Sequence, residues 1–487
     1  MHSPFSHEST DERAQRRAAI ARARRRQLAR GEGVRVSREE EENPKPPEAP
    51  LPLRIVNHWW DRLVDAIWSG SFSNQGEQYA SHQTARDYIC NTLGWSLWGL
   101  IFPILSVVAA QFVGIEQAGM FSMAMVVGQL LLFVANYGLL TYQVSDIDEM
   151  QSFNDYIIHR VICVVTMLVL GFLFVKVRGY DEQMASICTG VFLFRAFDGL
   201  CDVFEGRLQQ KDKLYLAGIS MVIRDGLGIA AFSAVLFITR DLAPACFAMA
   251  IAEIITFVVF TLPLTLLETE RSYPASSRAV KELFQMGFPL FLALFLFNLI
   301  DSVPRFAIEG ILTYEDQLFF NAMYFPARFI VMVSGLAYKP QLVRMAGIWA
   351  DPEKHGRFNV LILSILAVIL LLTGVVVVFM ATAGIPLLGI LYKADFEPFR
   401  PLALIMVVMG GACASIDFLY QVITVLREQE SVTKLYLITF AFAVPISILL
   451  VSFAGLAGAV VGSLVIMSIL FILLITEYLA IKRRLEN

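Results

Sequence analysis

Two groups of polar residues lie within long apolar stretches of the chain and share the spacing of an α-helix face. The first group is Asn298, Asp301, Arg305 and Glu309, and the second is Arg195, Asp198, Asp202 and Glu205. Intervals of three and four residues place the members of each group on one side of a helix. Because a charge in hydrocarbon is costly, such residues face a water-filled cavity or pair with one another. Asp301 is within reach of Arg305, and Arg195 of Asp198, for pairing along one helix.

Further polar residues inside apolar stretches extend this set of candidates. They are Arg224, Asp225, Glu253, Asn321, Tyr324, Arg328 and Asp417. Arginines in a wet cavity bind anionic groups through forked, charge-assisted hydrogen bonds, while the acids either hold those arginines in place or carry a coupling ion. The candidates to line a substrate cavity are Arg305, Asp301, Asn298, Arg195, Asp198, Arg328 and Asn321. The candidates for ion coupling are Asp301, Glu253 and Asp417.

The sequence lacks the motifs of covalent chemistry. It contains no GxxxxGK[ST] phosphate loop, no G-x-S-x-G elbow and no His/Glu metal motif. Its six cysteines are scattered, without a CxxC pair or metal-ligand spacing. We therefore expect a protein that is not an enzyme, with no catalytic residues, no metal site and no cofactor.

The elements that must position the polar residues are membrane-spanning helices. Of the 487 residues, 56% are hydrophobic and 17% charged, whereas soluble globular proteins carry roughly 25% charged residues. From Asn91 onward, apolar runs of roughly 18–25 residues recur, the length that an α-helix needs to cross a bilayer. We predict twelve spans: Thr92–Val113, Ala118–Leu140, Ile157–Val175, Met184–Phe204, Leu216–Ile238, Ala243–Leu267, Phe288–Ile311, Leu318–Tyr338, Phe358–Ala381, Leu402–Leu426, Leu435–Phe453 and Leu456–Ala480. The apolar Gly384–Tyr392 stretch is either a short re-entrant segment or a lengthened helix end.

Charged loops give the predicted orientation. With the arginine-rich N-terminus in the cytoplasm, most loop lysines and arginines fall on the cytoplasmic side. The other side carries only Lys176, Arg178, Arg240, Lys393 and Arg400. This is the positive-inside pattern. We expect a multi-pass protein of the cell (cytoplasmic) membrane with both termini in the cytoplasm.

Four regions follow from these patterns. Residues 1–50 are predicted to be a disordered cytoplasmic tail, and residues 54–70 an amphipathic helix that lies in the membrane interface or packs on a protein surface. Residues 88–267 and 283–481 form two six-helix lobes. The eight arginines from Arg13 to Arg30 belong to a solvated tail, or alternatively bind anionic lipid headgroups or nucleic acid. A net charge of −4 does not suggest a nucleic-acid partner.

Short motifs occur in a defined order along the predicted spans. Gly114-Ile-Glu-Gln-Ala-Gly-Met-Phe-Ser separates the first two spans, and Asn136-Tyr-Gly-Leu-Leu closes the second. Gly287-Phe-Pro-Leu and Pro304-Arg-Phe-Ala-Ile-Glu-Gly open the second half, and Ile385-Pro-Leu-Leu-Gly-Ile-Leu-Tyr precedes span ten. In order and spacing they resemble polysaccharide (O-antigen/capsule-type) flippases of the multidrug/oligosaccharidyl-lipid/polysaccharide exporter superfamily, over residues 85–480. The long N-terminal extension departs from that family, as does Lys393, where the family often has glycine.

The resemblance implies an all-α polytopic membrane protein with about twelve transmembrane helices in two six-helix lobes around a central cavity. It also implies that lipid-linked oligosaccharide moves from the cytoplasmic to the outer leaflet. The expected partners are that lipid-linked glycan, membrane lipids, and a glycan polymerase or glycosyltransferases. Three alternatives remain open: a drug or small-solute antiporter of the same fold, a membrane glycan polymerase or ligase, and a scaffold. The short predicted external loops leave little room for the acceptor site of a polymerase.

Overall fold

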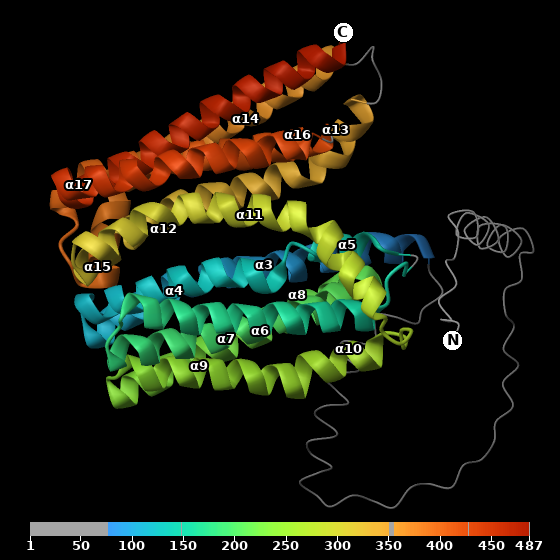
Figure 1. The fold of residues 1–487 in the computed structure, drawn as a ribbon, viewed down its shortest axis with the longest axis horizontal. Coiled ribbons are helices and arrows are strands. Elements are labelled where there is room, and N and C mark those ends of the chain that lie inside the picture. The colour runs from blue at the N-terminus through green and yellow to red at the C-terminus, as the bar shows by residue number, and fades with distance from the viewer. Residues whose placement is uncertain (1–75, 148, 350–354, 427, 487) are drawn as a thin grey trace, which may run out of the picture. The chain divides into compact units, whose positions relative to one another are not determined.

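The computed structural model describes residues 76–147, 149–349, 355–426 and 428–486 (Figure 1). Within these ranges every regular element is a helix, which confirms the prediction of an all-α polytopic membrane protein. One compact unit extends from Glu77 to Asn487. The predicted tail (residues 1–50) and the predicted interfacial helix (residues 54–70) lie outside the described residues.

The first half of the compact unit consists of α-helices, some of which begin at side-chain caps. They are α3 (Gly76–Val113), α4 (Ile115–Asn136), α5 (Leu140–Ser145), α6 (Phe153–Arg178), α7 (Glu182–Gln210), α8 (Leu214–Thr239), α9 (Leu242–Thr256) and α10 (Leu262–Glu268). A π-helical turn, Phe257–Thr261, joins α9 to α10. Ser152 and Asp155 form a capping box at α6, and the Asp181 side chain accepts a hydrogen bond from the backbone N–H of Met184 in the first turn of α7. The loops between these helices are therefore short and sharply bounded.

The second half contains helices broken by prolines and glycines. They are α11 (Ser277–Ile311), α12 (Tyr314–Tyr338), α13 (Leu342–Trp349), α14 (His355–Phe379), α15 (Ile385–Tyr392), α16 (Arg400–Val425) and α17 (Gln429–Glu486). A π-helical turn, Met380–Gly384, joins α14 to α15, so the Gly384–Tyr392 stretch is a lengthened helix end. Gly455, with φ of 57°, divides α17 into two arms, as the boundary between the last two predicted spans requires.

The described residues account for twelve passes through a membrane. Ten helical segments are long and apolar enough to cross, by length and composition. The last of them, Ser431–Arg484, contains the break at Gly455 and makes two passes. The charged stripe of α7 lowers the hydropathy of that helix, but α7 packs against α4, α6 and α9 in the middle of the first half. Adding α7 and the second arm of α17 to the ten segments gives twelve.

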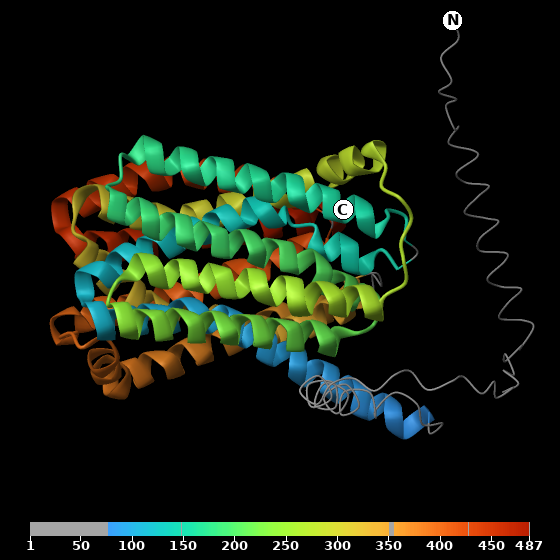
Figure 2. The ribbon, with the colours of Figure 1, turned by 90° about the horizontal axis from the view of Figure 1, so that it is seen from below.

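Helices of each half pack mainly on one another. In the first half α8 packs on α9 and α7 on α4, and Figure 2 shows these helices lying side by side. In the second half α17 packs on α11 and α16, and α12 on α16. We call the end where α5 and α10 lie the basic end, because Arg207, Lys211 and Lys213 are there, and the other the opposite end. Between the halves, α4 contacts α11 and α12, and α6 contacts α11.

The two halves touch closely at the opposite end. Gly119 of α4 approaches the backbone of Tyr314 so nearly that an added Cβ would lie 1.8 Å from the carbonyl oxygen. The Nε2 of Gln111 donates a hydrogen bond to the carbonyl oxygen of Ile390 at 3.1 Å. A residue without a side chain permits such an approach of two backbones. The opposite end is therefore closed in this structure.

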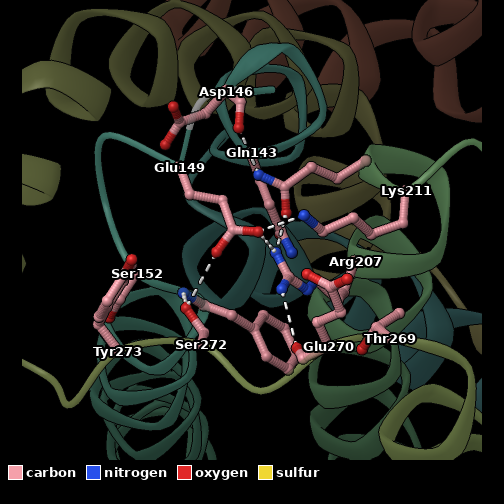
Figure 3. A network of polar contacts seen from close by, with 12 residues as sticks. Gln143, Asp146, Glu149, Ser152, Arg207, Lys211, Thr269, Glu270, Ser272 and Tyr273 are labelled. Carbon is pink, nitrogen blue, oxygen red and sulfur yellow. Dashed lines mark hydrogen bonds and ion pairs between the residues drawn. The ribbon is translucent and has the colours of Figure 1, made fainter. Parts of the chain in front are cut away.

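At the basic end, a polar network surrounds Glu149 (Figure 3). The Oε1 of Glu149 lies 2.9 Å from Nη1 of Arg207 and also pairs with Lys211. Its Oε2 accepts a hydrogen bond from Oγ of Ser272 at 3.2 Å. Burial raises the pKa of the Glu149 carboxyl, but the hydrogen bonds and charges of Lys211 and Arg207 outweigh burial. The pKa of Glu149 is therefore held below its ordinary value.

Replacing Glu149 by glutamine is expected to lower the unfolding free energy by about 1–2 kcal/mol at neutral pH. The contribution is complete above the unfolded pKa of Glu, about 4.3, and is lost as pH falls through the lower folded pKa. Thermal unfolding of both proteins at several pH values measures the difference. A difference that persisted below the folded pKa would contradict the ionic origin of this contribution.

Candidate functional site

Arg305 is held in place by groups of α11 and α12. Its Nε donates to Oδ1 of Asn321 at 3.0 Å, and its Nη1 donates to the carbonyl oxygen of Asp301 at 2.9 Å and to Oδ2 at 3.2 Å. The guanidinium carbon lies 4.0 Å from the centre of the Tyr324 ring, whose hydroxyl donates to Asp301 at 2.6 Å. The sequence therefore predicted the Asp301–Arg305 pair correctly, and Asn321 belongs to the same group.

Arg328 differs from Arg305 because the residue is exposed. It makes no hydrogen bond or ion pair with any residue in the described ranges, although Asp301, Tyr324 and Asp417 lie near enough to act on its charge. The nearby Asp417 carboxyl instead accepts a hydrogen bond from the hydroxyl of Tyr338. A free arginine beside a fixed polar group can bind an anionic ligand without first breaking a pair.

The remaining two residues of the predicted α11 stripe lie elsewhere. The Nδ2 of Asn298 donates to the carbonyl oxygen of Leu294 on its own helix at 2.8 Å. Glu309 pairs with Arg178 and accepts a hydrogen bond from the hydroxyl of Tyr180. Both partners of Glu309 come from the first half of the chain, so Glu309 joins the halves at the opposite end.

A second polar group lies inside the first half, with Arg224 of α8 at its centre. Its Nη1 lies 2.7 Å from Oδ1 of Asp198 and 2.5 Å from Oε1 of Glu253. Oxygens of Glu205 and Asp225 lie 3.5 Å and 3.8 Å from the same guanidinium. All five side chains are at most 5% exposed. We call this set, together with Arg195, the buried ion cluster.

Asp198 links the buried ion cluster to its surroundings. Its Oδ2 lies 2.8 Å from Nη1 of Arg195, the pair expected from their spacing in the sequence. The Nε1 of Trp98 on α3 donates to both carboxylate oxygens, at 3.0 and 3.2 Å. Asp198 therefore joins α3, α7 and α8 through a single carboxylate.

The buried ion cluster contains more acids than bases. Four carboxyl groups, those of Asp198, Glu205, Asp225 and Glu253, surround two guanidinium groups, those of Arg195 and Arg224. Both oxygens of Asp225 and Oε2 of Glu253 are buried without a hydrogen-bond partner. Unpaired buried carboxylates are costly. The cluster therefore has an excess of two acids, which bound protons would balance.

Asp202, in the predicted stripe of α7, belongs to a separate pair. Its Oδ2 lies 2.6 Å from Nη2 of Arg160 on α6. The Nη1 of the same arginine donates to Oδ1 of Asn136 at 2.7 Å and to the carbonyl oxygen of Ala135 at 3.0 Å. Arg160 therefore satisfies the last turn of α4, and this pair stabilises the packing of α4, α6 and α7.

The candidates chosen from the sequence thus divide between two places. Asp301, Arg305, Asn321 and Arg328 gather on α11 and α12, whereas Arg195, Asp198 and Glu253 belong to the buried ion cluster. In the described ranges no hydrogen bond or ion pair joins the two places, and no group of acids, histidines and cysteines has the arrangement of a metal site. Arg224, Asp225 and Glu205 were noted from the sequence, but none of them was assigned to the substrate cavity or to ion coupling. Trp98 was not singled out. The adjacent charges Arg224 and Asp225 in an apolar run were a usable signal, but Trp98 gave none.

Comparison with sequence families gives one assignment over more than half of the chain. The family described as "Polysaccharide biosynthesis protein" matches residues 85–345. A search of curated proteins gave no match.

Comparison with solved structures identifies the fold. The chain is similar to a multidrug resistance MATE family transporter of the MOP superfamily in its inward-facing conformation, with a TM-score of 0.55 and 14% identity. That match covers 79% of this chain and 96% of the transporter. It is also similar to the Vibrio cholerae MATE transporter VcmN in the bent form, with a TM-score of 0.54 and 16% identity over 83% and 99% of the two chains. The predicted helical architecture is therefore that of a known transporter fold.

Proposed function

This chain belongs to the polysaccharide biosynthesis protein family, and from that premise we propose that it flips lipid-linked oligosaccharide from the cytoplasmic to the outer leaflet. In this proposal the two halves rock between states open to either side, and no covalent step occurs. A charged glycan headgroup cannot cross hydrocarbon unaided. A polar path between the halves would carry the headgroup while the lipid tail stayed in the bilayer.

The observation that carries the proposal is the free guanidinium of Arg328. A charged side chain at membrane depth is costly unless water or a ligand solvates it. Arg328 is exposed and lies beside Asp301 and Tyr324, which hold Arg305. An anionic group on the lipid-linked substrate, such as a phosphate, matches the forked geometry of arginine. We assign Arg328 to contact this group and Arg305, Asp301 and Asn321 to shape the polar wall around it.

We assign ion coupling to the buried ion cluster. Glu253, a candidate from the sequence, has one oxygen on Arg224 and the other without a hydrogen-bond partner, and neither oxygen of Asp225 has one. These groups could take up and release protons or a cation as the halves move. Asp301 and Asp417, the other two candidates, accept hydrogen bonds from Tyr324 and Tyr338. They are weaker candidates, since each already accepts a hydrogen bond from a tyrosine.

The loop charges support an orientation with the basic end in the cytoplasm of the cell. Both chain termini then lie on the cytoplasmic side of the cytoplasmic membrane. Closure at the opposite end would make this structure a state closed to the outside. Membrane lipids, and the glycosyltransferases or polymerase that make and use the glycan, are the proposed partners.

Export of a drug or small solute is the second candidate function, and the transporter fold supports it. The structural relatives include multidrug resistance transporters, and the buried ion cluster would serve such an antiporter equally well. The two functions differ in the expected substrate, because a flippase substrate carries a long lipid tail. A drug exporter needs no unpaired arginine when its substrates are cations.

Depletion of the protein is expected to trap lipid-linked glycan in the cytoplasmic leaflet. The measurement is leaflet-resolved labelling of the glycan in depleted cells, with re-expression of the unmodified chain as the control. Drug susceptibility of the same cells is measured in parallel. Normal arrival of glycan in the outer leaflet would refute the flippase proposal, and a gain in drug sensitivity with normal glycan would favour the antiporter.

A further inference from the structure

The first part of α11 packs on the first half of the chain, although it is continuous with helices of the second half. Leu283 is fully buried in an apolar cluster whose other buried members all come from the first half: Leu139, Phe153, Tyr156, Val203 and Phe204. The ring of Phe284 lies 4.0 Å from that of His159. The ring of Phe291 stacks on Tyr137 with centroids 4.5 Å apart. Residues 277–291 therefore have the contacts of a first-half helix.

The rest of α11 packs largely on the second half, apart from contacts near its end such as the pairing of Glu309 with Arg178. The ring of Phe297 lies 5.7 Å from that of Tyr436 on α17. Further along, Asp301 accepts a hydrogen bond from Tyr324 of α12, and Arg305 donates one to Asn321 of α12. The change of partner thus occurs within a few residues, between Phe291 and Phe297.

The linker before α11, residues 269–276, forms hydrogen bonds with the first half at several points, some of which Figure 3 shows. The Oγ of Ser272 accepts from the backbone N–H of Phe153 at 2.8 Å, and the carbonyl oxygen of Glu270 accepts from Nη2 of Arg207 at 3.1 Å. The backbone N–H of Ser276 donates to Oδ1 of Asp155 at 2.7 Å. A linker with so many fixed groups cannot act as a free joint between the halves.

The middle of α11 has the features of a bend. Pro289 has no N–H to donate to the carbonyl of Gln285, one turn earlier, and its ring crowds that carbonyl. The Asn298 side chain adds a second donor to the carbonyl oxygen of Leu294, a contact that bends helices. Figure 1 shows α11, in yellow, changing direction along its length.

We propose that the two halves turn about the middle of α11, residues 288–298, and not about the linker. The linker and the first turns of α11 then move as part of the first half. The boundary between the two moving bodies then lies inside α11, and not in the linker that separates the two halves in the sequence. The inference concerns the motion alone and does not depend on the identity of the substrate.

Spin-label distances in the full chain in lipid nanodiscs test the proposal. Labels are placed at the exposed positions Glu182, Lys281 and Glu315, in pairs, with Cys90→Ser removing the one cysteine that is not buried. Gly119→Ala is used to separate the two halves at the opposite end, because its Cβ would clash with the backbone of Tyr314. We expect Gly119→Ala to lengthen the 182–315 distance and change the 281–315 distance, while 182–281 stays constant.

A change in the 182–281 distance with a constant 281–315 distance would place the joint in the linker and overturn the proposal. Unchanged distances in all three pairs would also overturn it, since the halves would not then move as separate bodies. Pro289→Ala restores the missing N–H and is expected to suppress the change in the 281–315 distance. Pro304→Ala is the matched control, because Pro304 lies in the same helix but beyond the bend. An equal effect of both substitutions would contradict the location at residues 288–298.

Discussion

Alanine in place of Arg224 is expected to lower the unfolding free energy by about 3–5 kcal/mol, as does the removal of one partner from other buried ion pairs. Arg224 lies within 2.7 Å of both Asp198 and Glu253, and all three side chains are at most 5% exposed. Without the guanidinium these carboxyl groups must take up protons or stay charged in an apolar interior. The measurement is the unfolding of the purified protein in detergent, by temperature or by denaturant.

Two comparisons separate this effect from a general loss of packing. Glu253→Gln added to Arg224→Ala removes one of the uncompensated acids, so the double variant is expected to regain part of the stability. Arg278→Ala removes one partner of the exposed Arg278–Glu282 pair and is expected to change stability by less than about 1 kcal/mol. If Arg224→Ala unfolded like the unmodified protein, the buried ion cluster would not stabilise the fold.

Helix geometry made part of the site predictable from the sequence. Asp301 with Arg305 and Arg195 with Asp198 are four and three residues apart, so their contact needs only that each segment be helical. The membrane spans were equally predictable, because the thickness of the bilayer fixes the length of each apolar run. The structure has helices at all twelve predicted positions, with ends that differ by a few residues or, for α3 and α11, by more.

Contacts between helices could not be predicted from residue spacing in the sequence. Arg224 meets Asp198 and Glu253 only because α8 packs on α9 and α7 lies beside both, and no spacing in the sequence reports that arrangement. The start of α11 at Ser277 was not predicted from the sequence, for a related reason. Its first turns carry Arg278, Lys281 and Glu282, which look like a polar loop until the apolar cluster around Leu283 shows which side is buried.

The contacts between helices also change the roles that we assign to the predicted arginines. Arg195 and Arg305 were chosen as substrate-lining residues, yet each pairs with a neighbouring carboxylate, and Arg305 also with an amide. Arg328 was chosen for the same reason, and it alone of the three has no partner in the described ranges. A loss of Arg305 is therefore expected to disturb the fold as well as transport, whereas the loss of Arg328 tests transport more directly.

Arg328→Ala is expected to reduce glycan transfer by about tenfold or more with little change in folding, since a hydrogen bond to a charged group contributes roughly 1.5–3 kcal/mol. The proposed anionic group of the substrate would lose its forked partner, but no hydrogen bond or ion pair within the described part of the chain would break. The measurement is outer-leaflet glycan labelling in cells that contain equal amounts of each variant. Arg328→Lys keeps the charge without the fork and is expected to fall between alanine and arginine. Arg400→Ala, at the exposed Arg400–Glu397 pair, controls for loss of a surface arginine. Full transfer by Arg328→Ala at unchanged protein level would remove the residue from the site and leave the flippase proposal without the observation that carries it.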